Sequence, residues 1–374
     1  MKGGSTVGLF SHGGKYAAPA KPSRLPRGFR VFLRILGGFS IFLVETVLLL
    51  AIALYGMMFV LAKGPSPTAR DLFVLSVRET SAMDFLANLF FTPEEIAQIE
   101  SKGEEPEFKD TDTSLIEIPD PTAPTHPDGP QPDAWGLVDE DGDGIIVESV
   151  KGEGYSGYMM VVLDPSRVIM GSRVSDFGSR GHTVADMVAQ FDAVAGINAG
   201  GFYDPDGRGN GSIPDSMVVY DGKIYYPELG VGNGFVGIDK DHILHVGRLT
   251  PNDVREKNIQ YGIGFGPILV ANGEAQTGLH SGVNPRTGIG QRSDGAILML
   301  VIDGRQVTSL GATYQDMAEV FLSYGAVNAC NLDGGSSSMM WYEDGYINNC
   351  ASVVGIRPVP TTFLVLKEGA NANG

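Results

Sequence analysis

The feature that most restricts how this chain can fold is a 28-residue apolar run from Ile35 to Ala62, interrupted by a single acid, Glu45. A helix needs about 20 apolar residues to cross a bilayer. A cleaved signal peptide usually has an apolar stretch of about 7–15 residues followed by a small-x-small site. Here the stretch is longer, and no Ala-x-Ala lies directly before Lys63. We therefore expect residues 35–62 to be a retained transmembrane anchor rather than a buried core helix.

The charge of the chain changes sign at the same place. Residues 1–44 carry seven basic side chains and no acid, whereas from Lys63 onward 20 Lys+Arg stand against 43 Asp+Glu. Because basic flanks stay in the cytoplasm, we expect residues 1–34 to be a cytoplasmic tail and residues 63–374 to be extracytoplasmic. The net charge of −17 also argues against a nucleic-acid partner, which would require a basic face.

Residues 63–134 are expected to form juxtamembrane helices and then a linker. Pro93 suits the first turn of a helix that ends at Glu100. Residues 101–134 contain seven prolines among many acids, and such a composition buries little and stays extended.

An acidic string follows the linker. Asp139, Asp141 and Asp143 occupy alternate positions before Gly144, which matches the first half of a calcium-binding loop. The twelfth position is Val150 instead of the bidentate Glu. Calcium binding and a plain acidic turn both remain open, and no other cofactor is expected.

Residues 135–374 are expected to be an α+β domain, a mixed β-sheet with flanking helices. Short apolar runs bounded by Gly and Asp turns predict strands, and two segments have helical periodicity, residues 184–191 and 313–324. The predicted strands are 145–150, 159–163, 194–198, 217–220, 268–271, 296–303, 326–332 and 362–366.

One β-α-β unit places acidic residues together. If strands 296–303 and 326–332 are parallel, their carboxyl ends meet at one edge of the sheet, where sites form in such units. Asp303 and Asp333 end these two strands, and Asn198 ends strand 194–198. We expect the three side chains to line one cleft.

The string from Asn331 to Ser338 is the most unusual motif. A carboxylate ends a strand, two glycines let the backbone bend around a ligand, and three hydroxyls follow. The motif predicts a ligand site with contacts from Asp333, Gly334, Gly335 and Ser336; the alternative is a tight loop with a serine cap.

Two further motifs offer polar groups. Arg286, in Asn-Pro-Arg-Thr-Gly-Ile-Gly-Gln, has a planar guanidinium that suits a phosphate or carboxylate, although a surface salt bridge fits equally well. The other motif runs from Asn198 to Asp204 and includes an aromatic platform for a sugar. The substrate contacts expected from the two are Asn198, Gly200, Gly201, Phe202, Asp204 and Gln291.

Together these motifs resemble the phosphodiester glycosidase family, which includes a mammalian lysosomal enzyme and bacterial envelope proteins. The resemblance runs from about Val161 to Val365. It implies hydrolysis of a sugar joined through its anomeric oxygen to a phosphodiester, and it places Asn198, Arg286, Asp303 and Asp333 in the pocket. Ser336 stands where a third glycine is often found.

The predicted function is therefore an extracytoplasmic glycosidase acting on phosphodiester-linked glycans, in exopolysaccharide or other cell-envelope metabolism. Cleavage at an anomeric carbon commonly uses two carboxylates. We expect Asp333 and Asp303 to flank the bond and Arg286 to stabilise the departing phosphate. The alternative is a non-catalytic carbohydrate-binding envelope protein on the same fold. A Ser-His-Asp hydrolase is disfavoured because the Gly-x-Ser-x-Gly motif is absent from the sequence.

Two cysteines are too few for a disulfide scaffold or a four-thiolate zinc site. Cys330 and Cys350 flank the Asp333 turn, and an oxidising location would favour a disulfide between them. Two buried thiols are the alternative.

Overall fold

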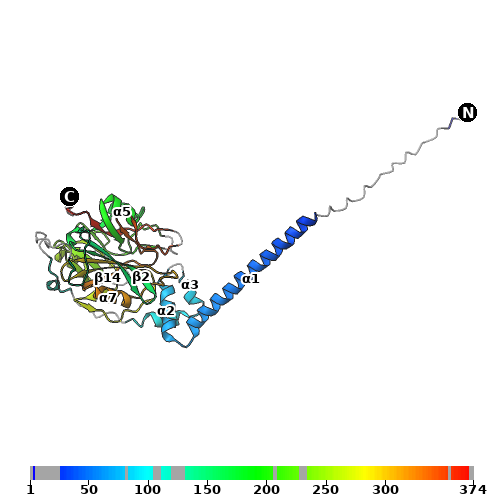
Figure 1. Ribbon diagram of the computed structural model, residues 1–374, viewed down its shortest axis with the longest axis horizontal. Helices are drawn as coiled ribbons and strands as arrows, with labels where there is room; N and C mark the ends of the chain where they lie inside the picture. Colours follow the sequence, from blue (N-terminus) through cyan, green and yellow to red (C-terminus); the bar gives the residue numbers. More distant parts are fainter. Residues whose placement is uncertain are drawn as a thin grey trace. The chain divides into compact units, whose positions relative to one another are not determined.

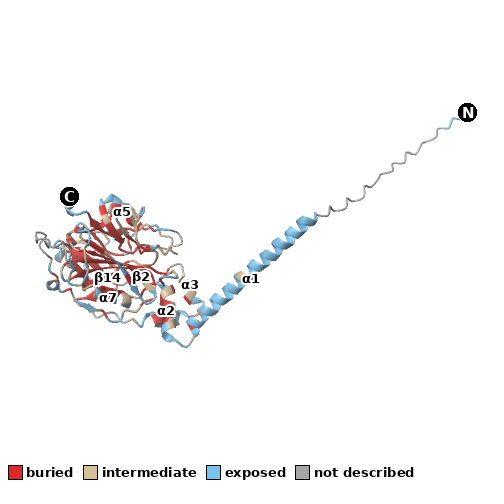
Figure 2. Ribbon diagram, in the orientation of Figure 1, coloured by how far each residue is buried: buried red, intermediate tan, exposed pale blue. Residues whose placement is uncertain are grey.

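The structure is a computed structural model that describes residues 3–4, 26–80, 83–103, 111–118, 131–204, 209–226, 234–352 and 355–369. It divides into two units, residues 1–60 and residues 61–374. The first unit consists mainly of α1 (Arg27–Lys63; Figure 1). Most of the large apolar residues of α1 are exposed (Figure 2). Within the described part of the chain, α1 alone is long and apolar enough to cross a membrane. The expected anchor, residues 35–62, lies within it.

Three helices begin the second unit: α2 (Pro67–Arg78), α3 (Phe85–Asn88) and α4 (Pro93–Glu100). The helix expected at Pro93 is confirmed, because Thr92 and Glu95 form a reciprocal capping box at its start. A small core joins these helices to the end of α1 and to the segment before α4. Its buried residues are Ala62, Val74, Leu75, Val77, Ala87, Phe91, Ile96 and Ile99. The segment expected to be only juxtamembrane thus lies in the same compact unit as the sheets.

The described parts of the expected linker also contact the sheets. Thr111 exchanges hydrogen bonds with the backbone of Val246, and the Glu117 amide donates to the Ser293 carbonyl. Ile116 is buried. Residues 104–110 and 119–130 of this linker lie outside the described residues.

A seven-stranded sheet contains most of the predicted site residues. Its strand order is β1-β2-β13-β12-β14-β10-β11. The strands are β1 (Ile145–Gly152), β2 (Tyr155–Val162), β10 (Ile268–Ala271), β11 (Glu274–Ala275), β12 (Arg286–Arg292), β13 (Ile297–Ile302) and β14 (Ala326–Asn331).

Two five-stranded sheets complete the unit. The β4 sheet has the order β16-β15-β4-β17-β3, and the β9 sheet has the order β6-β5-β9-β7-β8. The strands of the β4 sheet are β3 (Val168–Ser172), β4 (Ala193–Asn198), β15 (Met340–Tyr342), β16 (Gly345–Tyr346) and β17 (Thr361–Leu366). Those of the β9 sheet are β5 (Val218–Tyr220), β6 (Lys223–Ile224), β7 (Phe235–Asp239), β8 (Leu244–Gly247) and β9 (Ile259–Ile263).

The main core lies between these sheets. Met299 of β13 packs in one apolar cluster with Ile197 of β4 and Val236 of β7. Helix α7 (Tyr314–Ser323) covers the other face of the seven-stranded sheet, and α5 (Val184–Gln190) covers the other face of the β4 sheet. Figure 1 shows these two helices on opposite sides of the strands. The short α6 (Pro251–Glu256) packs against β9.

The α+β class is confirmed, with one difference in strand pairing. All recorded strand pairs among the described residues are antiparallel, so the sheet is not mixed at the level of neighbours. β13 and β14 do run parallel, as expected, but β12 lies between them and pairs antiparallel with both. The two expected helices, α5 and α7, each start with a Thr–Asp capping box.

Candidate active site

The predicted residues meet at one edge of the seven-stranded sheet. Because β13 and β14 are parallel, Asp303 and Asp333 follow strands that end at the same edge. β12 begins at this edge, since Arg286 pairs with Ile302. β4 of the other sheet also ends here, because the Asp333 amide donates to the Ala199 carbonyl, with 2.9 Å between N and O.

Asn198 fixes the backbone at Asp333. Its side-chain amide donates to the Asp333 carbonyl (2.6 Å), and its side-chain oxygen accepts bonds from the Thr287 hydroxyl and the Met339 amide. Asn198 is completely buried. Its side chain therefore holds the strand ends together from beneath the site.

The Asp333 carboxyl has the most unusual electrostatic environment at this edge. Its pKa is raised to about 7, chiefly by burial and also by the charges of Asp215 and Asp204, while a Ser337 hydrogen bond and the Arg357 charge oppose the shift. The side chain nonetheless keeps some solvent exposure. A half-ionised, accessible carboxyl at neutral pH is suited to proton transfer.

Asp215 is the carboxylate whose charge contributes most to the raised pKa of Asp333. Burial raises its pKa as well. Its carboxylate and the Phe265 ring lie over Gly201, where a Cβ atom would approach the ring to 2.8 Å. Gly201 is thus required for close packing beneath these groups.

Asp204 and Arg357 form a bidentate pair beside this carboxyl group. Arg357 donates to both Asp204 oxygens, at 2.6 and 2.8 Å, and to Ser336 Oγ at 3.3 Å. Its guanidinium also lies over the buried Phe202 ring, 5.0 Å from the centroid. Although burial favours the neutral acid, Arg357 holds the pKa of Asp204 below its ordinary value.

Asp303 lies at the same edge but is engaged elsewhere. Its carboxylate accepts hydrogen bonds from the Asn348 side chain and from the backbone and side chain of Asn349. Asn348 in turn bonds the Ser338 carbonyl and the Met340 amide. Asp303 therefore braces the chain that follows the Asp333 turn.

Arg286 is buried, and its guanidinium donates three hydrogen bonds to protein groups. Its Nε donates to the Ala312 carbonyl (3.0 Å), and its Nη2 donates to the Gly282 carbonyl (2.6 Å) and to Glu79 (2.7 Å). The guanidinium also lies 4.2 Å from the centroid of the Tyr314 ring. In this arrangement Arg286 contacts α7 and the end of α2.

Gln291 lies at the opposite end of β12. It lies five residue steps along the strand from Arg286, or about 16 Å. Its side chain accepts from the Leu244 amide and donates to the His242 and Gly295 carbonyls, so it joins two loops distant from Asp333.

The glycines expected to contact substrate bring backbones together. The Gly200 amide donates to Thr361 Oγ1, and a Cβ atom on Gly334 would lie 2.8 Å from the Pro285 carbonyl oxygen. Gly335 has φ 61°, in the left-handed region that favours glycine. The turn after Asp333 therefore needs both glycines in order to pass β12.

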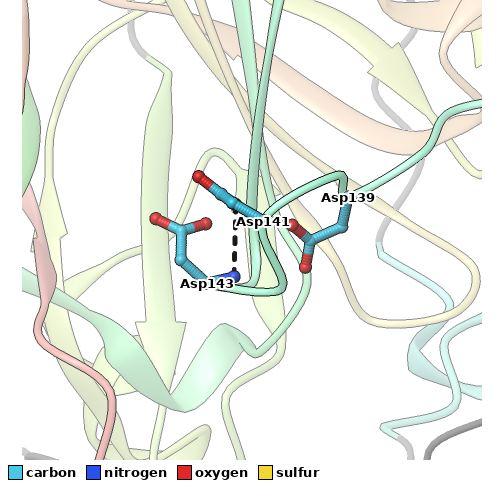
Figure 3. Close-up of side chains that lie close together, drawn as sticks. All are labelled: Asp139, Asp141 and Asp143. Atoms are coloured by element: carbon cyan, nitrogen blue, oxygen red, sulfur yellow. Dashed lines mark hydrogen bonds between the residues drawn. The ribbon is translucent and has the colours of Figure 1, made fainter. Parts of the chain in front are cut away.

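The acidic string forms a compact turn. Asp139, Asp141 and Asp143 offer carboxylate oxygens that all lie within 4.8 Å of one another (Figure 3). Their carboxylates also accept backbone hydrogen bonds within the loop, two of them to Asp139. Such oxygens suit a hard cation, and the same bonds stabilise an acidic turn, so both interpretations of the sequence remain compatible with this geometry.

The structure does not contain the disulfide between Cys330 and Cys350 that an oxidising location would favour, because both are free thiols. Cys330 is buried in the main core, where its sulfur contacts the Phe265 carbonyl, whereas Cys350 packs with the cluster under α5.

Four residues of this region are missing from the predicted set: Asp215, Arg357, Arg305 and Glu79. Of these, only Arg305 had a visible signal, since it comes two positions after a predicted strand-ending carboxylate. The others reach the site from segments far away in the sequence.

Comparison with known proteins finds a family model that matches part of this chain. Residues 191–366 match the family model described as phosphodiester glycosidase. The chain is 34% identical over 181 residues to SPbeta prophage-derived uncharacterized protein YomE of Bacillus subtilis (strain 168), covering 45% of this chain and 27% of that protein. It is 26% identical over 217 residues to N-acetylglucosamine-1-phosphodiester alpha-N-acetylglucosaminidase of Mus musculus, covering 52% of this chain and 41% of that protein. The chain thus spans less than half the length of either relative.

Two solved structures match over part of the chain. The catalytic domain of the zebrafish N-acetylglucosamine-1-phosphodiester alpha-N-acetylglucosaminidase, auto-inhibited by its pro-peptide, has a TM-score of 0.49 and 20% identity, covering 60% of this chain and 82% of that chain. A hypothetical protein from Synechocystis has a TM-score of 0.44 and 15% identity, covering 60% of this chain and 62% of that chain. The matched segment, residues 191–366, contains Asp333, Asp215, Asp204 and Arg357, whereas Glu79 lies outside it.

Proposed function

We propose that this chain, in which residues 191–366 are a phosphodiester glycosidase domain, hydrolyses sugar-1-phosphodiesters at the anomeric carbon. The observation that carries the proposal is the Asp333 carboxyl. It has a pKa of about 7 and lies at an accessible edge of the sheet, beside Asp215 and the Arg357–Asp204 pair. A structural carboxylate would instead be held ionised by its partners, as Asp204 illustrates, because Arg357 holds its pKa below the ordinary value.

In the proposed reaction Asp333 acts as the general base. Its carboxylate takes a proton from water as the water oxygen bonds to the anomeric carbon, and the bond from that carbon to the phosphodiester oxygen breaks. The bond electrons stay on the phosphate, which leaves as a monoester with a second negative charge. The phosphate is a good leaving group, so protonation by an acid contributes little. Asp215 is the proposed second carboxylate.

The test uses purified chain and a panel of sugar-1-phosphodiesters, beginning with N-acetylglucosamine 1-(methyl phosphate), since the mouse relative is named for this sugar. We expect release of free sugar by the wild type and a loss of at least about 100-fold in kcat for Asp333→Asn, as removal of a general base costs. Turnover of Asp333→Asn at the wild-type rate would refute the catalytic role. Sugar binding without turnover by the wild type would favour a carbohydrate-binding protein instead.

We also propose that α1 is a signal anchor and that the enzyme acts outside the cytoplasm on phosphodiester-linked glycans of the cell envelope. Support comes from the exposed apolar surface of α1 and from the basic residues before it. Protease added to intact cells should digest residues 63–374 and spare an epitope placed before Arg27. Protection of the domain until the cells are permeabilised would reverse the topology.

A further inference from the structure

The C-terminal end of α2 packs against the edge of the sheet at which Asp333 lies. A Cβ atom on Gly282 would lie 2.6 Å from the carbonyl carbon of Leu75 and closer still to the Ser76 backbone, so only glycine permits this approach. The Val283 amide also donates to Ser76 Oγ at 2.8 Å. The helix is thus docked backbone to backbone against the loop that leads into β12. It lies outside the segment that matches the family model.

Glu79, directly after α2, holds this loop by its carboxylate. One oxygen accepts from the Gly282 amide (2.8 Å), and the other accepts from Arg286 Nη2 (2.7 Å) and Asn284 Nδ2 (3.0 Å). Arg286 is buried at this point. A carboxylate with three donors forms a strong, directional link between the helix and the sheet edge.

Arg305 is held by the same helix end. Its Nη2 donates to Thr80 Oγ1 (2.7 Å) and to Asn284 Oδ1 (3.0 Å), while its buried Nε has no hydrogen-bond partner. The residue also has φ 56°, a conformation that non-glycine residues rarely adopt. Its guanidinium lies over Gly335, with Nη2 at 3.3 Å from the position of a Cβ atom there.

The charges of Arg286, Arg305 and Glu79 favour the binding of an anion. Burial and the neighbouring Arg286 lower the pKa of Arg305, and Glu79 opposes that effect. Two guanidinium groups against one carboxylate leave one positive charge, which equals the single negative charge of a phosphodiester. The Arg305 guanidinium lies over Gly335, two residues after the proposed catalytic carboxyl.

We propose that Arg305 binds the substrate phosphate beside the Asp333 turn, and that Glu79 and Thr80 are positioning residues that hold Arg305 for this task. The juxtamembrane helix α2 is then part of the active site. This inference rests on the proposed function for its substrate. The opposite role, in which Glu79 occupies the phosphate position and inhibits the enzyme, predicts effects of opposite sign.

The first experiment tests Arg305 with the full chain in detergent and methyl phosphate as the probe. Arg305→Gln should weaken methyl phosphate binding by about 10- to 100-fold, as expected for loss of charge-assisted hydrogen bonds. Arg305→Lys should retain part of the affinity, and binding of free N-acetylglucosamine should not change. An unchanged methyl phosphate affinity, or an equal loss for sugar and phosphate, would overturn the assignment. Because this binding needs no turnover, it can succeed even where the proposed hydrolysis fails.

The second experiment tests the helix end. Glu79→Gln should raise KM for the phosphodiester and Ki for methyl phosphate by about tenfold, with Ki for free sugar and the acid limb of the kcat–pH profile unchanged. Glu79→Asp should recover part of the loss. Glu94→Gln, the same chemical change on exposed α4, is the matched control. Faster turnover or tighter phosphate binding in Glu79→Gln would overturn the positioning role and establish inhibition.

Discussion

Replacing Asp333 by Asn is expected to stabilise the protein while it abolishes activity. Burial raises the pKa of this carboxyl from 3.8 to about 7. A raised pKa means that the folded state holds the proton more tightly than the unfolded state does. The resulting cost to stability is absent below about pH 4, grows as the pH rises toward 7, and is complete above 7. Asn cannot ionise, so the variant avoids this cost.

The size of the gain follows from that shift. A difference from 3.8 to about 7 corresponds to roughly 4 kcal/mol at 1.36 kcal/mol per pH unit. The residue keeps some solvent exposure, and Asn must reproduce the hydrogen bond with Ser337. We therefore expect the free energy of unfolding to rise by about 1–3 kcal/mol at pH 8. For a domain of this size that is a rise in Tm of roughly 2–5 °C.

Thermal unfolding of the wild type and Asp333→Asn at pH 5 and pH 8 measures this effect. The variant should gain more at pH 8 than at pH 5, and its activity should be lost at both. The same gain in Tm over the wild type at both pH values would refute the electrostatic account of this carboxyl. A variant less stable than the wild type at pH 8 would also refute it.

Three other predictions concern neighbouring groups. Asp215→Asn removes a negative charge near Asp333, so the acid limb of the kcat–pH profile should move to lower pH; a shift upward would contradict the coupling. Asn198→Ala should lower the free energy of unfolding by about 2–4 kcal/mol and reduce kcat, because the three hydrogen bonds that fix the Asp333 turn are lost. An unchanged kcat would show that the turn keeps its conformation without them. Cys350 should react with a thiol reagent in the native protein, and Cys330 should react only after denaturation. The absence of titratable thiols would show that the two cysteines form a disulfide.

The arrangement of β13, α7 and β14 could be predicted from the sequence because each signal is local. β13 is a continuous apolar run, and Thr313 with Asp316 caps the helix that follows. From these elements alone, Asp303 and Asp333 could be placed at one edge of the sheet.

The role of the Arg286–Gln291 motif could not be predicted in the same way. It resembles a ligand loop because it is rich in polar residues and glycine, yet it is β12, a strand buried along its entire length. Its polar side chains are satisfied by distant partners, such as Glu79 for Arg286. Gly288 is needed because a Cβ atom there would lie 2.9 Å from Met317 and Phe321 of α7. Spacing within a motif does not encode such long-range contacts.

The juxtamembrane segment shows the same limit. Its composition predicts juxtamembrane helices followed by an extended linker. Glu79 contacts a loop more than 200 residues later in the sequence, and this contact depends on tertiary packing. Residue 282 must be glycine for α2 to approach the loop so closely.

The measurement that tests the central claim most directly is hydrolysis of N-acetylglucosamine 1-(methyl phosphate) in water labelled with oxygen-18. Attack at the anomeric carbon breaks the bond from carbon to oxygen, so the methyl phosphate product should contain no label while free sugar accumulates. Labelled methyl phosphate would mean that water attacks phosphorus, and the chain would then be a phosphodiesterase and not a glycosidase.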